Sequence, residues 1–388
     1  MNRVDVRFQP PESVARALRA MAAIGALTFG AGLVFAPERV WPNLLLVSYF
    51  ALGLSLAGLV FVALQYITGA GWSTALRRIP EAMATLLPAG GVGLALVFLL
   101  RPSLYSWTGA EAATLHGFKQ LWLTLPFFLA RSLVYLLIWT ALAYAIVRTS
   151  RRQDEDGDHV HTRRNITLSA VFLVLFGATF WLASYDWIMS LEPHWASTLF
   201  GIYNFAGLFV GGLATMIVFA VWLERLGPLR GVLSRDHMHD LGILLFAFST
   251  FWAYIWFCQY MLIWYADIPE ETVYYIRRLH GAWQPLFIAN LFLNWIAPFF
   301  LLMPRQVKRS VAVMLRVSLF VLVGRWLDLY LLIMPPFAGA VPVFGIWEIG
   351  MMFGAVGAFS LLMFRALGQA PMIPVRDPYL AESLHIHR

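Results

Sequence analysis

The sequence predicts an all-α polytopic membrane protein with ten transmembrane helices. Three observations lead to this fold class. Of the 388 residues, 60% are hydrophobic and only 13% are charged, whereas about 25% of the residues of an average soluble domain are charged. Ten apolar runs approach the roughly 20 residues that a helix needs to cross a bilayer. Lys and Arg are concentrated on every second connection between these runs, as expected of a chain that crosses a membrane repeatedly.

Each apolar run is expected to form one span. In chain order, the predicted spans are residues 16–36, 44–67, 82–100, 121–147, 166–191, 196–222, 239–265, 281–303, 311–334 and 343–366. The first run is not followed by a small-residue cleavage site and a soluble domain, so we expect a retained span rather than a signal peptide. The longest charged connection, RTSRRQDEDGDHVHTRR at residues 148–164, predicts a solvated loop between the fourth and fifth spans.

The distribution of Lys and Arg predicts the orientation of the chain. If the N-terminus is cytoplasmic, the cytoplasmic segments carry 20 Lys and Arg residues and the segments on the other side carry five. Because positive residues accumulate on the cytoplasmic side of membrane proteins, both termini are expected in the cytoplasm. The net charge of +7 follows from this bias, so no nucleic-acid partner is expected.

Composition also limits the cofactors that this chain is expected to hold. Its single cysteine, Cys258, excludes a disulfide framework, a CxxC redox pair and a cluster ligated by cysteines of this chain alone. A membrane-embedded b-type haem needs axial ligands, usually histidines, on facing spans, and no histidine falls deep inside a predicted span. We therefore expect neither haem nor an iron–sulfur cluster in this chain.

A repeated pattern divides the chain into two similar halves. In each half a His-Gly pair precedes one span, the next span carries an acid, and proline follows that acid seven residues later. The first copy has His116, Asp186 and Pro193, and the second has His280, Asp328 and Pro335. We infer two four-helix bundles, spans 2–5 and 6–9, flanked by spans 1 and 10. An even number of spans in each unit makes the repeat parallel.

This repeat predicts four structural regions. Residues 1–43 hold the cytoplasmic N-terminus and the first span, and residues 44–191 form the first bundle. Residues 192–335 form the second bundle, and residues 336–388 hold the last span and a cytoplasmic tail.

Acidic and histidine side chains are expected to form a polar layer near the outer membrane surface. At about 1.5 Å per residue, Asp186 and Asp328 lie far along their spans from the cytoplasmic side, and Glu348 lies close to the outer start of its span. Glu192, His194 and His116 share that side. Placing a charged group inside a membrane costs several kcal/mol, so such residues are candidates for a functional site.

Oxidation of a hydroquinone is one chemistry that such a layer serves. A histidine can hydrogen-bond one hydroquinone oxygen, and a carboxylate can accept the released proton and pass it to the nearby aqueous face. His116 and Asp186 are the candidates for these two roles, with Glu192 and His194 as further ligands. The alternative is structural: Asp186 pairs with Arg131, Asp328 pairs with Arg325 on its own helix face, and Glu192 and His194 are ordinary interface residues.

Three segments carry a resemblance to a known family. ASYDWIMSLEPHWASTLFGIYNFAG, HDLGILLFAFSTFWAYIWFCQYMLIWYADIPEE and the tail DPYLAESL resemble the ActF subunits of bacterial alternative complex III, a quinol:cytochrome c oxidoreductase, which are similar to NrfD/PsrC-type membrane subunits. The likeness covers nearly all of the chain. It implies ten spans, two four-helix bundles and cytoplasmic termini in the bacterial inner membrane.

The resemblance also implies partners and a site. The implied partners are a paralogous NrfD-like membrane subunit (ActC), a periplasmic iron–sulfur subunit, haem c subunits, other subunits of the complex and lipid. His116 and Asp186 are the positions that match the family's first-bundle His/Asp site, where quinol would bind without a covalent bond. In this family the better-supported quinol site belongs to the paralogue, and ActF is often assigned a proton-conducting or scaffolding role.

Several functions therefore stay open at this stage. The chain is expected to contribute to quinol binding, or to conduct protons through Asp328, Arg325 and Glu348, with Arg131 as a counter-ion. Cytoplasmic access would then run through His239 and Asp240. A purely structural membrane anchor for the redox subunits is the alternative. A small-molecule transporter is disfavoured, because corresponding spans show no pair of helices broken by Gly or Pro at mid-membrane depth.

Overall fold

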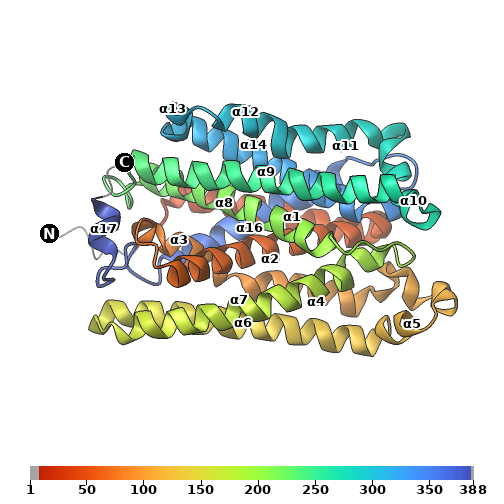
Figure 1. The fold of residues 1–388 in the computed structure, drawn as a ribbon, viewed down its shortest axis with the longest axis horizontal. Coiled ribbons are helices and arrows are strands. Elements are labelled where there is room, and N and C mark those ends of the chain that lie inside the picture. Colours follow the sequence, from red (N-terminus) through yellow and green to blue (C-terminus); the bar gives the residue numbers. More distant parts are fainter. Residues whose placement is uncertain (1–7, 386–388) are drawn as a thin grey trace.

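The protein is described by a computed structural model, which covers residues 8–385. These residues form an elongated array of helices that run roughly along one axis (Figure 1), and no β-strand occurs among them. Nine of the described helices are long and apolar enough to cross a membrane: Glu12–Phe35, Pro37–Thr68, Arg78–Leu100, Leu125–Asp156, Val160–Leu191, Phe200–Leu226, Arg235–Ala266, Gly281–Leu302 and Ile346–Leu367. The predicted helical, multi-pass character is confirmed.

The individual α-helices subdivide some of these segments. They are α1 (Glu12–Phe35), α2 (Pro37–Thr68), α3 (Arg78–Ala84), α4 (Leu87–Leu100), α5 (Phe118–Trp122), α6 (Leu125–Asp156), α7 (Val160–Trp187), α8 (Phe200–Leu226), α9 (Arg235–Ala266), α10 (Pro269–Leu279), α11 (Gln284–Leu291), α12 (Ala297–Leu302), α13 (Arg305–Lys308), α14 (Val311–Ile333), α15 (Pro335–Ala338), α16 (Ile346–Leu367) and α17 (Leu380–Leu384).

Helix α14 is the predicted span that differs in composition. Its 23 residues would cross about 35 Å at the usual helical rise, but they include Arg316, Arg325 and Asp328. Every 18-residue stretch of this helix contains all three charged groups, whereas the nine helices above each have an apolar stretch of that length with at most two. Arg325 and Asp328 are buried against other helices of the protein, which removes them from contact with lipid.

Two helices form the centre of the array. In both α2 and α8 the most apolar stretch is 83% buried, whereas in α1 only 17% is buried. Helix α2 packs on α4 and α7, α6 packs on α7, and α8 packs on α9 and α14. Helices α2 and α8 also pack on each other, so they join the helices that precede residue 192 to those that follow it.

Helices α1 and α16 cross each other through glycines. A Cβ atom added to Gly25 would lie 2.4 Å from the Cα atom of Gly354, so neither position has room for a larger residue. Gly350 and Gly354 stand four residues apart, as in the small-xxx-small pattern that lets membrane helices approach closely. The first and last spans therefore form one pair, which packs against α2.

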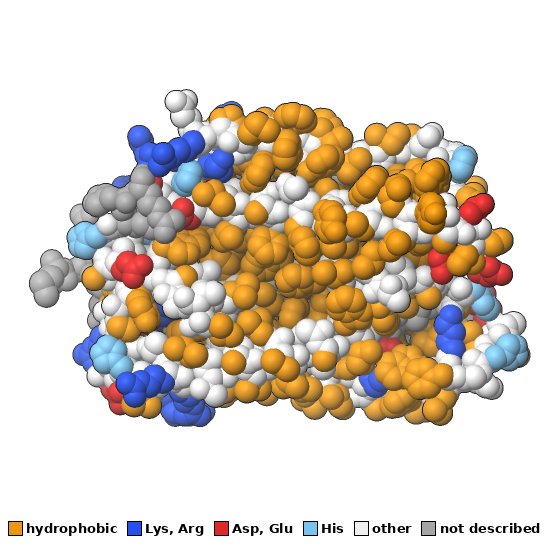
Figure 2. All heavy atoms as spheres, in the orientation of Figure 1, with side chains coloured by type: hydrophobic (Ala, Val, Ile, Leu, Met, Phe, Trp, Pro, Cys, Tyr) orange, Lys and Arg blue, Asp and Glu red, His pale blue; other side chains and the backbone are white. Residues whose placement is uncertain are grey.

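The two ends of the array differ in charge. One end, here called the basic end, holds connections 69–77, 157–159, 227–234 and 303–310 and the tail 368–385. Lys and Arg side chains gather at this end, on the left in Figure 2. The opposite end holds connections 101–124, 188–199, 267–283 and 334–345. This alternation agrees with the predicted order of connections, and the assignment of the basic end to the cytoplasm stays a prediction.

The predicted solvated loop at residues 148–164 is wrong. Helix α6 continues to Asp156 and α7 begins at Val160, so only residues 157–159 connect them. Gly157 ends α6 with a φ of 75°, and the Asp158 carboxylate accepts a hydrogen bond from the Val160 backbone N–H at 2.8 Å. Arg, Gln and Glu favour helix, so the two helices extend past the apolar stretch as a hairpin.

Candidate functional site

Asp186, near the end of α7, is clamped by donors from the first half of the chain. Its side chain is fully buried. Arg131 of α6 donates from Nε to Oδ2 at 2.9 Å and from Nη2 to Oδ1 at 2.7 Å. The indole N–H of Trp122 reaches Oδ1 at 2.8 Å and the hydroxyl of Tyr135 reaches Oδ2 at 3.1 Å. Each carboxylate oxygen therefore accepts two hydrogen bonds.

The guanidinium of Arg131 is enclosed as tightly as its partner. It lies 3.9 Å from the ring of Trp122 and 4.3 Å from the ring of Phe127. Its third donor, Nη1, reaches the Trp122 carbonyl oxygen at 3.0 Å. A bidentate pair of this kind is the strong form of an Arg–carboxylate contact, and it leaves the Asp186 carboxylate no free acceptor position facing a ligand.

Asp328 of α14 has a different set of partners. Arg325, three residues earlier on the same helix, donates from Nη2 to Oδ2 at 2.6 Å. Oδ1 accepts from the amide of Asn290 on α11 at 2.8 Å and from the hydroxyl of Tyr203 on α8. Asp328 is 1% exposed. Three helices therefore meet at this carboxylate, and only one guanidinium nitrogen holds it.

An irregular turn of helix supports the Asp328 partners. Residues Phe292–Ile296 form a π-helical turn between α11 and α12, just before Pro298, which has no N–H for a helical hydrogen bond. Inside this turn the amide of Asn294 donates to the carbonyl oxygens of Asn290 and Gly324, at 3.0 and 2.9 Å. Single π-helical turns of this kind occur frequently at functional sites.

Glycines make room for the same network. A Cβ atom at Gly207 of α8 would lie 2.0 Å from Nη2 of Arg325, and a Cβ at Gly324 would lie 3.0 Å from the Asn294 amide nitrogen. Arg325 donates to Asp328 directly, and Asn294 donates to the Asn290 side chain, which in turn donates to Asp328. The small residues at these positions therefore serve the placement of Arg325 and Asn294.

A small cavity lies beside Arg325, between the two halves of the chain. It has a volume of about 20 Å³ and is lined by Tyr49, Asn204 and Arg325 among mostly apolar side chains. A space of this size can hold about one water molecule if polar partners are present. The hydroxyl of Tyr49 donates to Asn204 at 3.2 Å, so polar groups of α2 and α8 face the guanidinium across this space.

The predicted quinol ligands do not come together. His116 is exposed in the connection at the opposite end and makes no hydrogen bond to Asp186. His194 is also exposed, and its Nε2 lies 3.4 Å from Oγ1 of Thr114. The His-Gly pairs do share a backbone feature, because Gly117 and Gly281 have φ angles of 62° and 64°. Glycine suits these left-handed turns, which explains the repeated glycine but not a ligand site.

Glu192 joins two connections at the opposite end. Arg277 and Arg278 of α10 each donate to one of its carboxylate oxygens at 2.9 Å. Arg278 also donates to the carbonyl of Leu331 at 2.9 Å, and its guanidinium lies 3.4 Å from the ring of Tyr274. Glu192, predicted as a cofactor ligand, is thus used to hold α10 against the rest of the protein.

Glu348 is the third buried acid near this end. Arg39 donates to it from Nε at 3.1 Å and from Nη2 at 2.5 Å, and the amide of Asn43 donates at 3.1 Å. Glu348 begins α16 and Arg39 begins α2, so this pair ties the last long helix to the second. Asp186, Asp328 and Glu348 each have an arginine partner, as the structural interpretation of these acids requires.

The residues predicted for proton access lie at the basic end. The Nδ1 atom of His239 is 3.5 Å from Oδ1 of Asp240 at the start of α9. Lys308 is buried nearby and donates to the carbonyls of Leu302 and Met303 at 2.6 and 3.0 Å. Removal from water lowers the pKa of Lys308, since burial disfavours the charged form. No hydrogen bond links these groups to Asp328 in the described chain.

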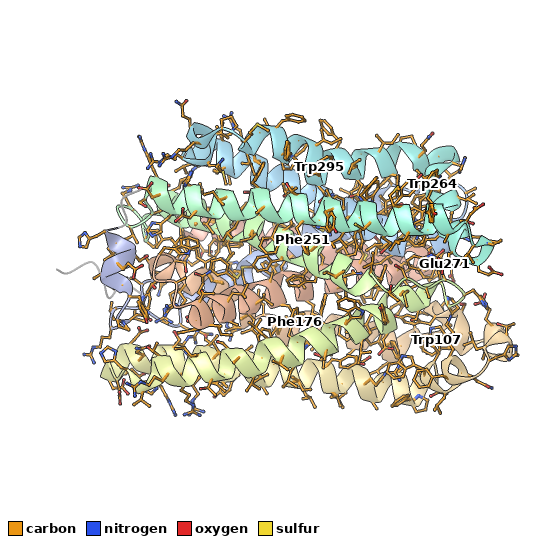
Figure 3. All side chains as sticks on the ribbon, viewed as in Figure 1. Trp107, Phe176, Phe251, Trp264, Glu271 and Trp295 are labelled. Carbon is orange, nitrogen blue, oxygen red and sulfur yellow. The ribbon has the colours of Figure 1, made fainter. Side chains whose placement is uncertain are left out.

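Several residues that donate hydrogen bonds to the buried acids were not predicted from the sequence. Trp122, Tyr135, Tyr203 and Asn290 all donate to the buried acids. The only sequence feature that could have indicated one of them is a polar residue inside an apolar run, such as Asn290. Aromatic side chains are frequent throughout the protein, including Phe176 and Phe251 among the helices and Trp264 toward the opposite end (Figure 3). Composition therefore does not distinguish the tyrosines and tryptophans that bind a carboxylate.

Comparison with known proteins does not assign the chain to a family. No family profile matches the sequence, and no curated protein matches it. Among residues 8–385, no group of three or more His, Cys, Asp and Glu side chains is placed to hold a metal ion.

Proposed function

We propose that the chain is an integral membrane subunit of a quinol:cytochrome c oxidoreductase of the alternative complex III type. In this proposal α14 is the ninth of ten spans, and the spans form two parallel-related four-helix bundles with α1 and α16 outside them. The basic end faces the cytoplasm of a bacterium. Support comes from the three segments that resemble ActF and from the alternation of Lys and Arg between the ends.

The proposed partners carry the redox centres. They are an NrfD-like paralogue, a periplasmic iron–sulfur subunit and haem c subunits, and the electrons of quinol oxidation would pass through them. The opposite end of this chain would face those periplasmic partners. In this arrangement the buried acids near the opposite end lie close to the place where quinol protons are released.

Within that complex we propose that this subunit handles protons at Asp328. One observation carries this role: Asp328 and Arg325 belong to a buried polar network with a π-helical turn on one side and a water-sized cavity on the other. Both carboxylate oxygens of Asp186 are already occupied by two donors each, and His116 makes no hydrogen bond to it. The geometry therefore supports proton handling at Asp328 better than quinol binding at His116 and Asp186.

The test compares two buried acids in the assembled complex. We expect Asp328→Asn to lower the number of protons released per electron, and the matched Asp186→Asn to leave that ratio unchanged. Unchanged stoichiometry in an assembled Asp328→Asn complex would contradict the proposal. If that variant does not assemble, the double variant Arg325→Gln/Asp328→Asn removes both charges and avoids an unpaired buried guanidinium.

A purely structural anchor is the second candidate, and the arginine partners of all three buried acids favour it. For a structural anchor, assembly of the complex should require the ion pair but not a particular position for each of its two charges. The exchanged variant, Arg325→Asp with Asp328→Arg, should then assemble and turn over as the unaltered protein does. Assembly without normal proton release would instead favour the proton-handling role.

A further inference from the structure

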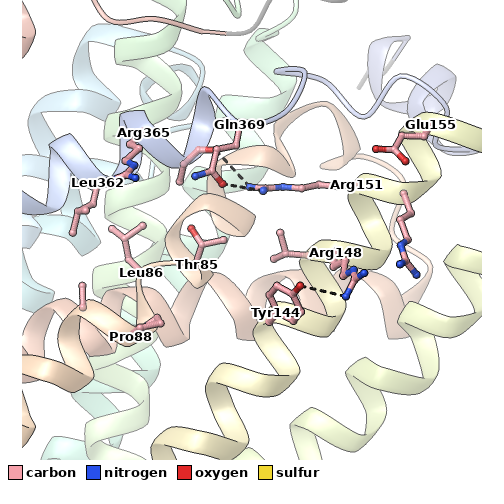
Figure 4. Close-up of a pocket in the computed structure, with 14 residues that line it drawn as sticks. Thr85, Leu86, Pro88, Tyr144, Arg148, Arg151, Glu155, Leu362, Arg365 and Gln369 are labelled. Carbon is pink, nitrogen blue, oxygen red and sulfur yellow. Dashed lines mark hydrogen bonds between the residues drawn. The ribbon is translucent and has the colours of Figure 1, made fainter.

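A cleft at the basic end is lined by arginine and apolar side chains that have no part in the proposed function. It has a volume of about 720 Å³ and lies between the last turns of α6, the turn from α3 to α4 and the last turn of α16 (Figure 4). Pro88 lacks a backbone N–H and interrupts the helix between α3 and α4. Thr85 and Leu86, at this break, line the cleft.

Four arginines line this cleft. Arg148, Arg151 and Arg152 come from α6, and Arg365 comes from α16. Arg151 and Arg152 follow Arg148 by three and four residues, which places both beside Arg148 on the same side of the helix. Glu155 is the one acidic side chain in the lining. The cleft therefore carries an excess of three positive charges in a space open to the surface.

The cleft arginines lack acidic partners of the kind that Arg77, Arg78 and Arg309 have at the same end. Arg77 pairs with Asp377, Arg78 pairs with Glu81 and Asp154, and Arg309 pairs with Asp236. None of the four cleft arginines forms an ion pair with a described Asp or Glu residue. This difference leaves their charge available for an anion from outside the protein.

The contacts of Arg151 show where an anion would bind. Its Nη1 donates to Oε1 of Gln369 at 3.0 Å, as the dashed line in Figure 4 shows. Its Nε is buried and has no hydrogen-bond partner in the described chain. A buried N–H without an acceptor is costly. Arg148 is held only at its own helix, where Nη1 donates to Tyr144 at 3.3 Å. Arg151 Nη2 also reaches the Ala366 carbonyl oxygen at 3.5 Å. Donors for phosphate oxygens therefore come from the exposed guanidinium groups of Arg148 on α6 and Arg365 on α16, on two sides of the cleft.

The far side of the cleft is apolar and continues along the membrane face of the protein. Pro88 and Ala89 line the cleft, and both are exposed at the start of α4. Beyond them Val92, Leu96 and Leu99 are 60%, 42% and 63% exposed. Their spacing of four and three residues places them on one face of α4. A ligand with an anionic head and a long apolar chain would match both the arginine-lined cleft and the exposed apolar face of α4.

We propose that this cleft binds the phosphate headgroup of an anionic phospholipid of the membrane leaflet at the basic end. The guanidinium groups hold the phosphate oxygens, and an acyl chain lies along the exposed face of α4. Basic pockets between membrane helices on the cytoplasmic side are suited to such headgroups, and Arg binds phosphate with more than one N–H group. The lipid joins α4, α6 and α16, which meet at this cleft.

The test measures lipid binding to the full-length chain by native mass spectrometry. Phosphatidylglycerol and phosphatidylethanolamine with identical acyl chains are compared, since both have a phosphate and only the first has net negative charge. We expect Arg148→Gln/Arg365→Gln to weaken phosphatidylglycerol binding about thirtyfold, from loss of two charges near the surface. Both side chains are exposed, and unchanged thermal unfolding in detergent would show that the variant folds.

The matched control is Arg163→Gln/Arg164→Gln. These two arginines are exposed near the start of α7, at the same end and outside the cleft. Little change in lipid binding is expected from them. An equal loss in both variants would overturn the proposal in favour of a general surface charge effect. Equal binding of the two lipids, or full competition by millimolar inorganic phosphate, would also overturn it, because either result removes the anionic lipid as the specific ligand.

Discussion

The two buried acids of the repeat have different surroundings. Asp186 is held by two nitrogens of an arginine from a neighbouring helix and by two aromatic donors. Asp328 is held by one nitrogen of an arginine on its own helix, by Asn290 and by Tyr203. The first arrangement gives each carboxylate oxygen two donors, while the second has a water-sized cavity beside Arg325.

This difference shows how one repeated position can take two roles. The Asp186 clamp connects α6, α7 and the connection that carries Trp122, so its main effect is on stability. The Asp328 network has a π-helical turn, amide side chains and a neighbouring water-sized cavity, which together give its charge more ways to rearrange. A buried pair beside a space that can hold water is better placed to exchange a proton than a pair whose acceptor positions are all occupied by protein donors.

Removal of the arginine from the Asp186 clamp should have the largest effect. Arg131→Leu leaves a buried carboxylate without its counter-ion, which typically costs about 3 to 5 kcal/mol. We expect loss of assembly or a large fall in the thermal unfolding temperature in detergent. The double variant Arg131→Leu/Asp186→Leu should recover most of that loss, because it buries no charge. Equal damage in the single and double variants would mean that the pair does not determine stability.

A methyl group at Gly207 should disturb the second site without changing any charge. The added Cβ would lie 2.0 Å from Nη2 of Arg325, so Gly207→Ala should move the guanidinium and cost about 2 to 3 kcal/mol. Gly211→Ala is the control on the same helix, because its nearest neighbour is the Leu54 side chain at 3.2 Å. Thermal unfolding of both variants measures the difference. Similar unfolding temperatures would contradict the crowding at Arg325.

The sequence predicted much of the fold because hydropathy is a local property. The spans around residues 44–67 and 281–303 follow from their own composition, and the arginine partners of Asp186 and Asp328 were expected as the structural alternative. The polar groups that complete each site depend on contacts between distant segments. Tyr203 and Asp328 are 125 residues apart, and nothing in the spacing of either residue indicates the contact.

The errors have equally local causes. The segment at residues 148–164 was predicted as a loop because its charges are unsuited to lipid, but charged residues form helix readily once a helix leaves the bilayer. His116 was matched to Asp186 by its place in the repeat. The position of its side chain depends instead on the fold of connection 101–124, which the repeat does not describe.

Loss of one tyrosine hydroxyl should separate the two acids more finely. Tyr203→Phe leaves Asp328 with two donors, and Tyr135→Phe leaves Asp186 with three. A hydrogen bond to a charged group contributes about 1.5 to 3 kcal/mol. We therefore expect a loss of about 2 kcal/mol for Tyr203→Phe and about half of that for Tyr135→Phe. Denaturant or thermal unfolding of the two variants provides the comparison, and a reversed order would show that Asp186 is the less well satisfied carboxylate.

The smallest effect is expected at the indole of Trp122. Trp122→Phe removes the hydrogen bond to Oδ1 of Asp186 but keeps an aromatic ring over Arg131, so it should cost about 1 kcal/mol. Trp122→Leu removes the ring as well and loses the cation–π contact, which adds about 0.5 to 2 kcal/mol in a desolvated site. The step between the two variants measures how far the ring of Trp122 encloses the guanidinium. If Phe and Leu have the same unfolding temperature, the clamp depends on hydrogen bonds alone, and Phe127 is enough to shield Arg131 from solvent.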